Sequence, residues 1–275
     1  MNYLNLFLNS TPNSIIALVF GGTAALLSIL IFILGRKLVS FTFEKESADL
    51  AIKVQTSLLG FAVLILAFSI GDARSNLTKA NDAVDLEASQ IRHVGQLLFS
   101  YGNEETIAAH NALINFASSV VNDEWPLLSE ITSAGSQKTD AELRNLFQEI
   151  NNLKPTSKHQ EAVKVSLETN LEALHKSRDS VIDKANNQVP ALFWVMIISL
   201  VLVSMVFNFH YKLTKLNCLL IGSHMATVGI AIALLAMLDA PFRGQTAVSS
   251  NAIANQISKL NASAVEYELK VKVKE

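Results

Sequence analysis

The sequence predicts an all-α membrane protein with four transmembrane helices in two hairpins, an extramembrane helical bundle between spans 2 and 3, and a C-terminal amphipathic helix. Three observations predict this fold. Four uncharged apolar runs approach or reach the length of about 20 residues that a helix needs to cross a bilayer. The stretch between the second and third runs has apolar residues at helical spacing. Charged residues make up only 17% of the 275 residues, whereas soluble domains carry about 25%.

The four apolar runs have the length and composition of transmembrane helices. They cover residues 14–34, 54–70, 190–209 and 217–238. The first run is too long for a signal-peptide core, and no basic residue precedes it, so we expect it to be retained. Pro190 suits the first turn of the third span. In the fourth span Gly222, Ala226 and Gly229 lie close to one face, where small residues allow another helix to approach.

Two short links join the spans in pairs, which divides the chain into four segments. These are residues 1–70, with the N-terminal tail and first hairpin; 71–189, the bundle; 190–238, the second hairpin; and 239–275, the tail with the amphipathic helix. Both links must lie on one side of the membrane. The bundle and both termini must then lie on the other side.

The bundle is acidic, with 17 Asp and Glu against 11 Lys and Arg over residues 71–189. Leu77, Val84, Ile91 and Leu98 repeat every seven residues and form a coiled-coil-like seam. Gly71 is the only glycine or proline between span 2 and this seam, so we expect span 2 to continue out of the membrane as one long helix.

Three further helices are expected in the bundle. The first covers about 104–124 and is predicted to end at Trp125-Pro126, because the residue before a proline disfavours helix. Thr139 with Glu142 resembles a capping box for the second helix. The third is expected to begin at Thr156 or Ser157 and to lead into span 3.

Basic residues give an orientation. The first 13 residues contain no Lys or Arg, whereas Arg36 and Lys37 follow span 1, and the second link carries Lys212 and Lys215. The positive-inside rule therefore predicts cytoplasmic links, with the large domain and both termini outside. Basic residues near the membrane ends of the bundle oppose this asymmetry.

The signatures of common enzyme classes do not occur in the sequence. It has no glycine-rich phosphate loop, His-Glu-x-x-His, Cys-x-x-Cys or Gly-x-Ser-x-Gly, and its six histidines are scattered. Cys218 is the one cysteine, so an intramolecular disulfide is excluded. We therefore predict no enzymatic activity, no metal site and no cofactor. The net charge of −2 gives no reason to expect a nucleic-acid partner.

Three polar features stand out against the helical pattern, each with two interpretations. Glu87 lies on the stripe flanking the seam, where it could face a pore or another subunit, or could be an ordinary surface residue. His224 inside span 4 could be functional, or could be a neutral histidine bonded to a neighbouring helix. Asp239 and Arg243 after span 4 could pair around the turn at Pro241, or could mark an ordinary helix exit.

Several motifs together resemble the bestrophin-like domain family, which lacks a defined function. Residues 58–91, LLGFAVLILAFSIGDARSNLTKANDAVDLEASQI, resemble its second span and the rod that follows. Glu124-Trp125-Pro126 resembles a motif in the middle of that domain. Leu238-Asp239-x-Pro-Phe-x-Gly, followed by Val248-Ser249, resembles its C-terminal signature. The resemblance covers roughly residues 50–255.

The resemblance implies properties of the bestrophins themselves, which are pentameric anion channels. Their pore is lined by the second span and has an apolar neck, and the matching stretch here supplies four pore-lining candidates: Leu58, Phe61, Ile65 and Phe68. The implied partners are the lipid bilayer, further copies of the chain in a homo-oligomer such as a pentamer, and inorganic ions. The expected location is a bacterial cytoplasmic (inner) membrane.

Two points depart from bestrophins. They keep their large domain in the cytosol, opposite to the charge-based orientation, and the acidic calcium clasp of the animal channels has no match here. A non-conducting membrane sensor or assembly scaffold that uses the bundle remains the alternative function. Ion flux through reconstituted protein would separate the two.

Overall fold

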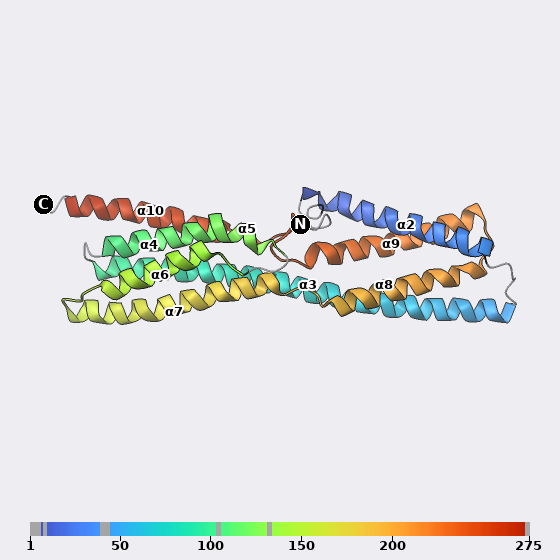
Figure 1. Cartoon of the computed structure of the whole chain (residues 1–275), viewed down its shortest axis with the longest axis horizontal. Helices are drawn as coiled ribbons and strands as arrows, with labels where there is room; N and C mark the ends of the chain where they lie inside the picture. The colour runs from blue at the N-terminus through green and yellow to red at the C-terminus, as the bar shows by residue number, and fades with distance from the viewer. Residues whose placement is uncertain (1–6, 8–9, 39–44, 103–105, 131–133, 273–275) are drawn as a thin grey trace. The chain divides into compact units, whose positions relative to one another are not determined.

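The chain folds into helices that form two compact units, shown in a computed structural model (Figure 1). The structure describes residues 7, 10–38, 45–102, 106–130 and 134–272, and no β-strand occurs within these ranges. Unit 1 comprises Met1–Asn76 and Gln188–Ala247, and unit 2 comprises Leu77–Asn187 and Val248–Glu275.

Unit 1 contains the membrane spans. Its elements are α2 (Asn13–Leu38), the first part of α3 (Lys45–Tyr101), α8 (Ala191–Val206), the 3-10 helix η2 (Phe207–His210) and α9 (Lys215–Leu238). Four helical segments of the described chain are long and apolar enough to cross a membrane. The all-α membrane fold with four spans is therefore confirmed.

A close helix crossing in unit 1 joins α2 to α9, the first span to the last. A Cβ atom added to Gly229 would lie 2.6 Å from the carbonyl oxygen of Phe20 and 3.0 Å from the Cα of Gly21. A Cβ on Gly222 would lie 2.8 Å from Ile29. Higher residue numbers on α2 thus meet lower numbers on α9, so the two helices run antiparallel. The helix that approaches the small-residue face of span 4 is α2.

Side chains of α3, α8 and α9 fill the remaining interior of unit 1. Leu66 of α3, Ile197 of α8 and Leu235 of α9 belong to one buried cluster. Ala62 and Met225 belong to a second buried cluster, together with Val201 and Met205 of α8. The two helices of each hairpin are consecutive in the chain, but the helices of one hairpin pack against those of the other: α2 packs on α9, and α3 packs with α8 and α9.

Unit 2 is a helical bundle. It contains the last part of α3, α4 (Thr106–Ser119), the π-helix η1 (Val120–Glu124), α5 (Trp125–Leu128), α6 (Gln137–Asn152), α7 (Lys158–Asn186) and α10 (Asn251–Lys272). The seam residues Val84, Ile91 and Leu98 are buried. α10 closes on α3 at Gly95, where a Cβ atom would lie 2.5 Å from the side chain of Leu260.

Two helix ends differ from the sequence-based expectation. Trp125-Pro126 does not end a helix: the Trp125 N–H donates to the Val120 carbonyl in a π-turn, and Pro126 lies in the first turn of α5, where its missing N–H costs nothing. Ser136, not Thr139, caps α6, because its side chain accepts from the Thr139 N–H at 3.4 Å. The predicted start at residue 104 lies outside the described residues.

Ser157 caps α7 as expected, and the predicted long helix from span 2 is α3, with 57 residues. α7 ends at Asn186, and α8 begins after Pro190, so span 3 is a separate helix.

Candidate functional site

The four pore-lining candidates lie on α3 within unit 1 and differ in exposure. Phe61 is 59% exposed and Phe68 is 68% exposed, with Leu64 beside them on the same uncovered face. Leu58 and Ile65 are half-buried at the edge of that face. A different face of α3, with Ala62, Leu66 and Ser69, is buried inside unit 1. A single chain thus leaves an apolar strip of α3 open to lipid or to another copy.

Glu87 is fully buried in unit 2, which is the opposite of a surface position. Neither carboxylate oxygen has a hydrogen-bond partner. The pKa of the Glu87 carboxyl is raised from 4.5 to about 8. Burial is the largest cause, the charge of Glu124 adds to it, and the charge of Arg178 opposes both. The carboxyl is therefore largely protonated at neutral pH. Its pore-facing or intersubunit role stays a prediction.

The two charged residues that act on Glu87, Glu124 and Arg178, form a buried ion pair. The Arg178 Nε donates to both carboxylate oxygens of Glu124, at 3.0 and 3.2 Å, and Nη2 donates to Oε2. Arg178 Nη1 lies 2.8 Å from Asp140 Oδ1 at the edge of the bundle. Burial lowers the pKa of Arg178, but the bonds to Glu124 and Asp140 outweigh it, so the pKa is raised. Arg178 remains charged at any physiological pH.

The π-helix and the following loop hold Glu124 in place. Glu124 is the last residue of η1, and π-turns inside helices are often found at functional sites. The Ser136 N–H donates to Glu124 Oε2 at 2.9 Å. Gly135 has φ +75°, and a Cβ there would lie 3.2 Å from Glu124 Oε2 and 3.3 Å from Arg178 Nη2. Glycine is therefore required beside the ion pair.

Asp239 connects the two ends of the second hairpin within unit 1. Its Oδ1 accepts a hydrogen bond from the Val189 N–H at 2.6 Å, and the Trp194 side chain donates to it as well. The charge of Arg243 also acts on Asp239. Gly244, with φ +72°, turns the chain directly afterwards. The carboxylate thus accepts a hydrogen bond from a backbone N–H that has no helical acceptor, because the helix is broken between α7 and α8.

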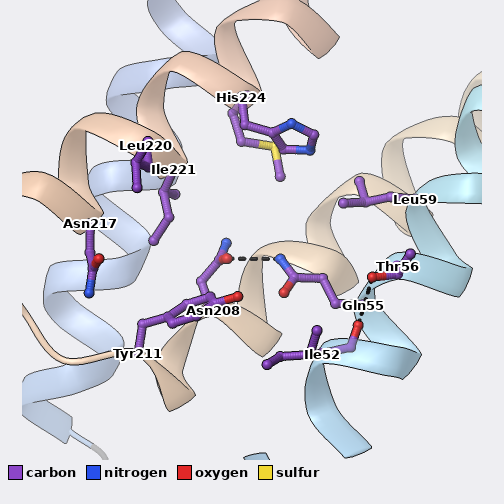
Figure 2. A pocket seen from close by; sticks show the side chains of 11 residues that line it. Ile52, Gln55, Thr56, Leu59, Asn208, Tyr211, Asn217, Leu220, Ile221 and His224 are labelled. Carbon is purple, nitrogen blue, oxygen red and sulfur yellow. Dashed lines mark hydrogen bonds between the residues drawn. The ribbon is translucent and has the colours of Figure 1, made fainter. Parts of the chain in front are cut away.

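His224 lines a cavity of about 460 Å³ in unit 1, between α3, η2 and α9 (Figure 2). Asn208, which is 3% exposed, lies in the wall and accepts a hydrogen bond from Gln55 Nε2 at 2.8 Å. α2 holds η2 in place, because Arg36 donates to the Phe209 carbonyl at 3.2 Å and Gly35 lies against the Phe209 ring. No group of three or more His, Cys, Asp or Glu in the described residues could hold a metal ion.

Comparison with known proteins gives the family. The model of the bestrophin-like domain matches residues 16–253, which is most of the chain. The chain belongs to the bestrophin-like family. No curated protein matches this bestrophin-like chain.

Solved structures share the fold of the bestrophin-like chain at low sequence identity. One mutant of a bacterial bestrophin homologue from Klebsiella pneumoniae is 14% identical, with a TM-score of 0.65 over 91% of this chain and 98% of its own. A second mutant of that homologue has a TM-score of 0.63, with 14% identity over 91% and 96% of the two chains. A structure described as a mutant membrane protein is 13% identical, with a TM-score of 0.65 over 92% and 99%.

Two functional candidates of this bestrophin-like chain escaped sequence reasoning. Arg178 falls at a gap in the apolar face of α7, between Leu174 and Val181, and a cation at a core position is the signal that could have revealed it. The sequence gives no comparable signal for Asn208. It is buried because the chain forms the 3-10 helix η2 there, whereas the apolar run 190–209 predicted a continuous span.

Proposed function

We propose that this chain forms a homo-oligomeric channel for inorganic anions, with a pore bordered by the exposed face of α3. The observation that carries the proposal is the uncovered apolar strip with Phe61, Leu64 and Phe68, in a helix that buries another face, with Ala62, Leu66 and Ser69, inside unit 1. A ring of such strips would form an apolar constriction, which gates a pore by dewetting. Family membership and the shared fold support this role.

The proposed stoichiometry is a pentamer, as the family resemblance implies. Native mass spectrometry of the detergent-purified protein measures it directly. A monomer has no central pore, so a monomeric protein would overturn the channel proposal.

Ion flux tests the pore itself. Protein reconstituted into liposomes is expected to pass chloride, and Phe61→Ala with Phe68→Ala is expected to raise the flux severalfold, because both changes widen and wet the constriction. Leu26→Ala on α2 is the control, since Leu26 is 70% exposed on a different span. An oligomer without flux, and with no effect of the double change, would contradict the proposal.

A second function has its own supporting observation. The fully buried carboxyl of Glu87, beside the Glu124–Arg178 pair, suits a bundle that senses proton concentration without conducting ions. If the oligomer carries no chloride at any pH, this non-conducting sensor or scaffold becomes the better proposal.

The proposed orientation keeps the short links in the cytoplasm and the bundle and termini outside, because Lys and Arg follow span 1 and flank the second link. In a Cys218→Ala background, a membrane-impermeant thiol reagent applied to intact cells should label Asn2→Cys and not Lys212→Cys. The reverse labelling would overturn this orientation and favour a cytosolic bundle.

A further inference from the structure

The cavity in unit 1 that His224 lines has no assigned ligand. Its walls come from α3, η2 and α9, and its volume of about 460 Å³ lies in the range of small-molecule pockets, about 300–1,000 Å³. None of its lining residues is Asp, Glu, Lys or Arg. A ligand there would meet amides, hydroxyls, one imidazole and apolar side chains.

One polar group of the wall lacks a partner. The side-chain Nδ2 of Asn208 is buried and makes no hydrogen bond, while its Oδ1 is occupied by Gln55. In Figure 2 this nitrogen lies next to the bonded oxygen, on the side of the view where His224 is drawn. A buried donor without an acceptor costs free energy, so the site favours a ligand that offers an oxygen acceptor.

The rest of the wall is suited to an apolar chain. Leu59, Ile221 and Met225 line the cavity beside the amide pair. Two other lining residues, Ile52 and Leu220, are 39% and 57% exposed on the outer surface of the spans. Thr56 and His224, which also line the cavity, are exposed as well. The mouth therefore carries both apolar and polar side chains, which suits a ligand with a polar head and an apolar chain.

We propose that this cavity binds the carbonyl end of an acyl lipid, with an ester or carboxyl oxygen accepting from Asn208 Nδ2 and the first methylenes lying against Leu59, Ile221 and Met225. Two sources supply this chemistry: a diacyl phospholipid of the membrane or a free fatty acid. The site lies apart from the exposed face of α3 and is independent of whether the protein conducts ions.

Photolabelling tests the proposal on the full-length oligomer in lipid nanodiscs. The probes are a phosphatidylcholine and a palmitic acid, each with a diazirine near the carbonyl end of the acyl chain. The expected result is crosslinking concentrated on residues 52–59 and 217–225, and competition by the unlabelled lipid. The probe that labels identifies the source.

Two variants and one control give the result its meaning. Thr56→Phe fills the mouth of the cavity, and Asn208→Leu removes the donor; each is expected to lower labelling of these segments about tenfold. Thr227→Val on α9 is the control, because Thr227 is exposed and does not line the cavity. Thr56 is itself exposed, so its variant should fold even if Asn208→Leu does not.

The opposite results are equally clear. Labelling by neither probe, or labelling spread evenly over the exposed faces of α2, α8 and α9 and unchanged in Thr56→Phe, would overturn the proposal. A zero-length crosslink between two copies of the chain at this mouth, formed without either probe, would also overturn it, because a neighbouring subunit would then fill the cavity.

Discussion

The guanidinium of Arg178 binds both carboxylate oxygens of Glu124 inside the bundle, at 3.0 and 3.2 Å from Nε. Both side chains are almost completely buried. A buried pair of this kind is little evidence of net stability compared with apolar residues, but removal of one partner leaves an uncompensated charge.

Arg178→Met should therefore strongly destabilise unit 2. The uncompensated buried charge costs about 3–5 kcal/mol, so the thermal unfolding midpoint in detergent is expected to fall by about 10 °C. Lys184→Met is the matched control on α7, because Lys184 pairs with the exposed Asp183 and such pairs contribute about 0–1 kcal/mol. Equal midpoints for the two variants would show that the buried pair does not behave as a unit.

Glu87→Gln should remove a pH dependence of stability. The pKa of Glu87 is raised from 4.5 to about 8, so the folded state holds a proton that the unfolded chain releases. The contribution of Glu87 to folding stability is then fully present below pH 4.5 and is lost as the pH rises toward 8. The midpoint of the Gln variant, relative to the original protein, should rise between pH 5 and pH 8.5.

The groups that act on Glu87 are Glu124 of η1 and Arg178 of α7, and Asp140 of α6 neutralises part of the same cation. Glu172→Gln on the exposed face of α7 serves as the control and should track the original protein at every pH. A constant difference between Glu87→Gln and the original protein across this range would contradict the prediction.

Gly229→Val should disrupt the α2–α9 crossing. Any Cβ there would meet backbone of α2 at 2.6 and 3.0 Å, and backbone cannot move aside as a flexible side chain can. The expected result is a lower yield of monodisperse protein in size-exclusion chromatography. Gly22→Val is the control, because a Cβ on Gly22 meets nothing within 4 Å. If both variants elute alike, the helices are not held at this distance.

Asp239→Leu and Asp239→Asn should separate charge from hydrogen bonding. Asn keeps an oxygen acceptor for the Val189 N–H, whereas Leu leaves that N–H unpaired at a cost of about 1–3 kcal/mol. We expect the unfolding midpoint of Asp239→Asn to stay near the original and that of Asp239→Leu to fall. Equal falls would mean that the negative charge, acting with Arg243, is what matters.

The spans could be located from sequence because apolar length is a local property. The runs at 14–34 and 217–238 lie within α2 and α9, and that at 54–70 lies within α3. The partner of each span is not a local property. Gly222 and Gly229 predicted a close helix, but nothing in their spacing identified α2 as that helix.

The bundle shows a similar division. The heptad seam placed Val84 and Ile91 in the core, whereas the burial of Glu87 between them differs from the surface position that was one of its two interpretations. The charged residues near Glu87 could not be predicted from sequence. Glu124 lies at the end of a π-helix, and Arg178 lies on α7, far from Glu87 in the sequence. The pore-lining role of α3 stays a prediction, since one chain shows an uncovered face and not its partner.

The contact between Gly21 and Gly229 also bears on how the protein is made. The ribosome must add about 200 residues after Gly21 before Gly229 exists, which takes about 10–40 s at ordinary translation speeds. During that time the glycine face of the first span lacks the helix that it contacts in the folded protein. Biogenesis of unit 1 is therefore completed by its last span, and a chain truncated before α9 would present quality-control proteases with an unfinished helix surface in the membrane.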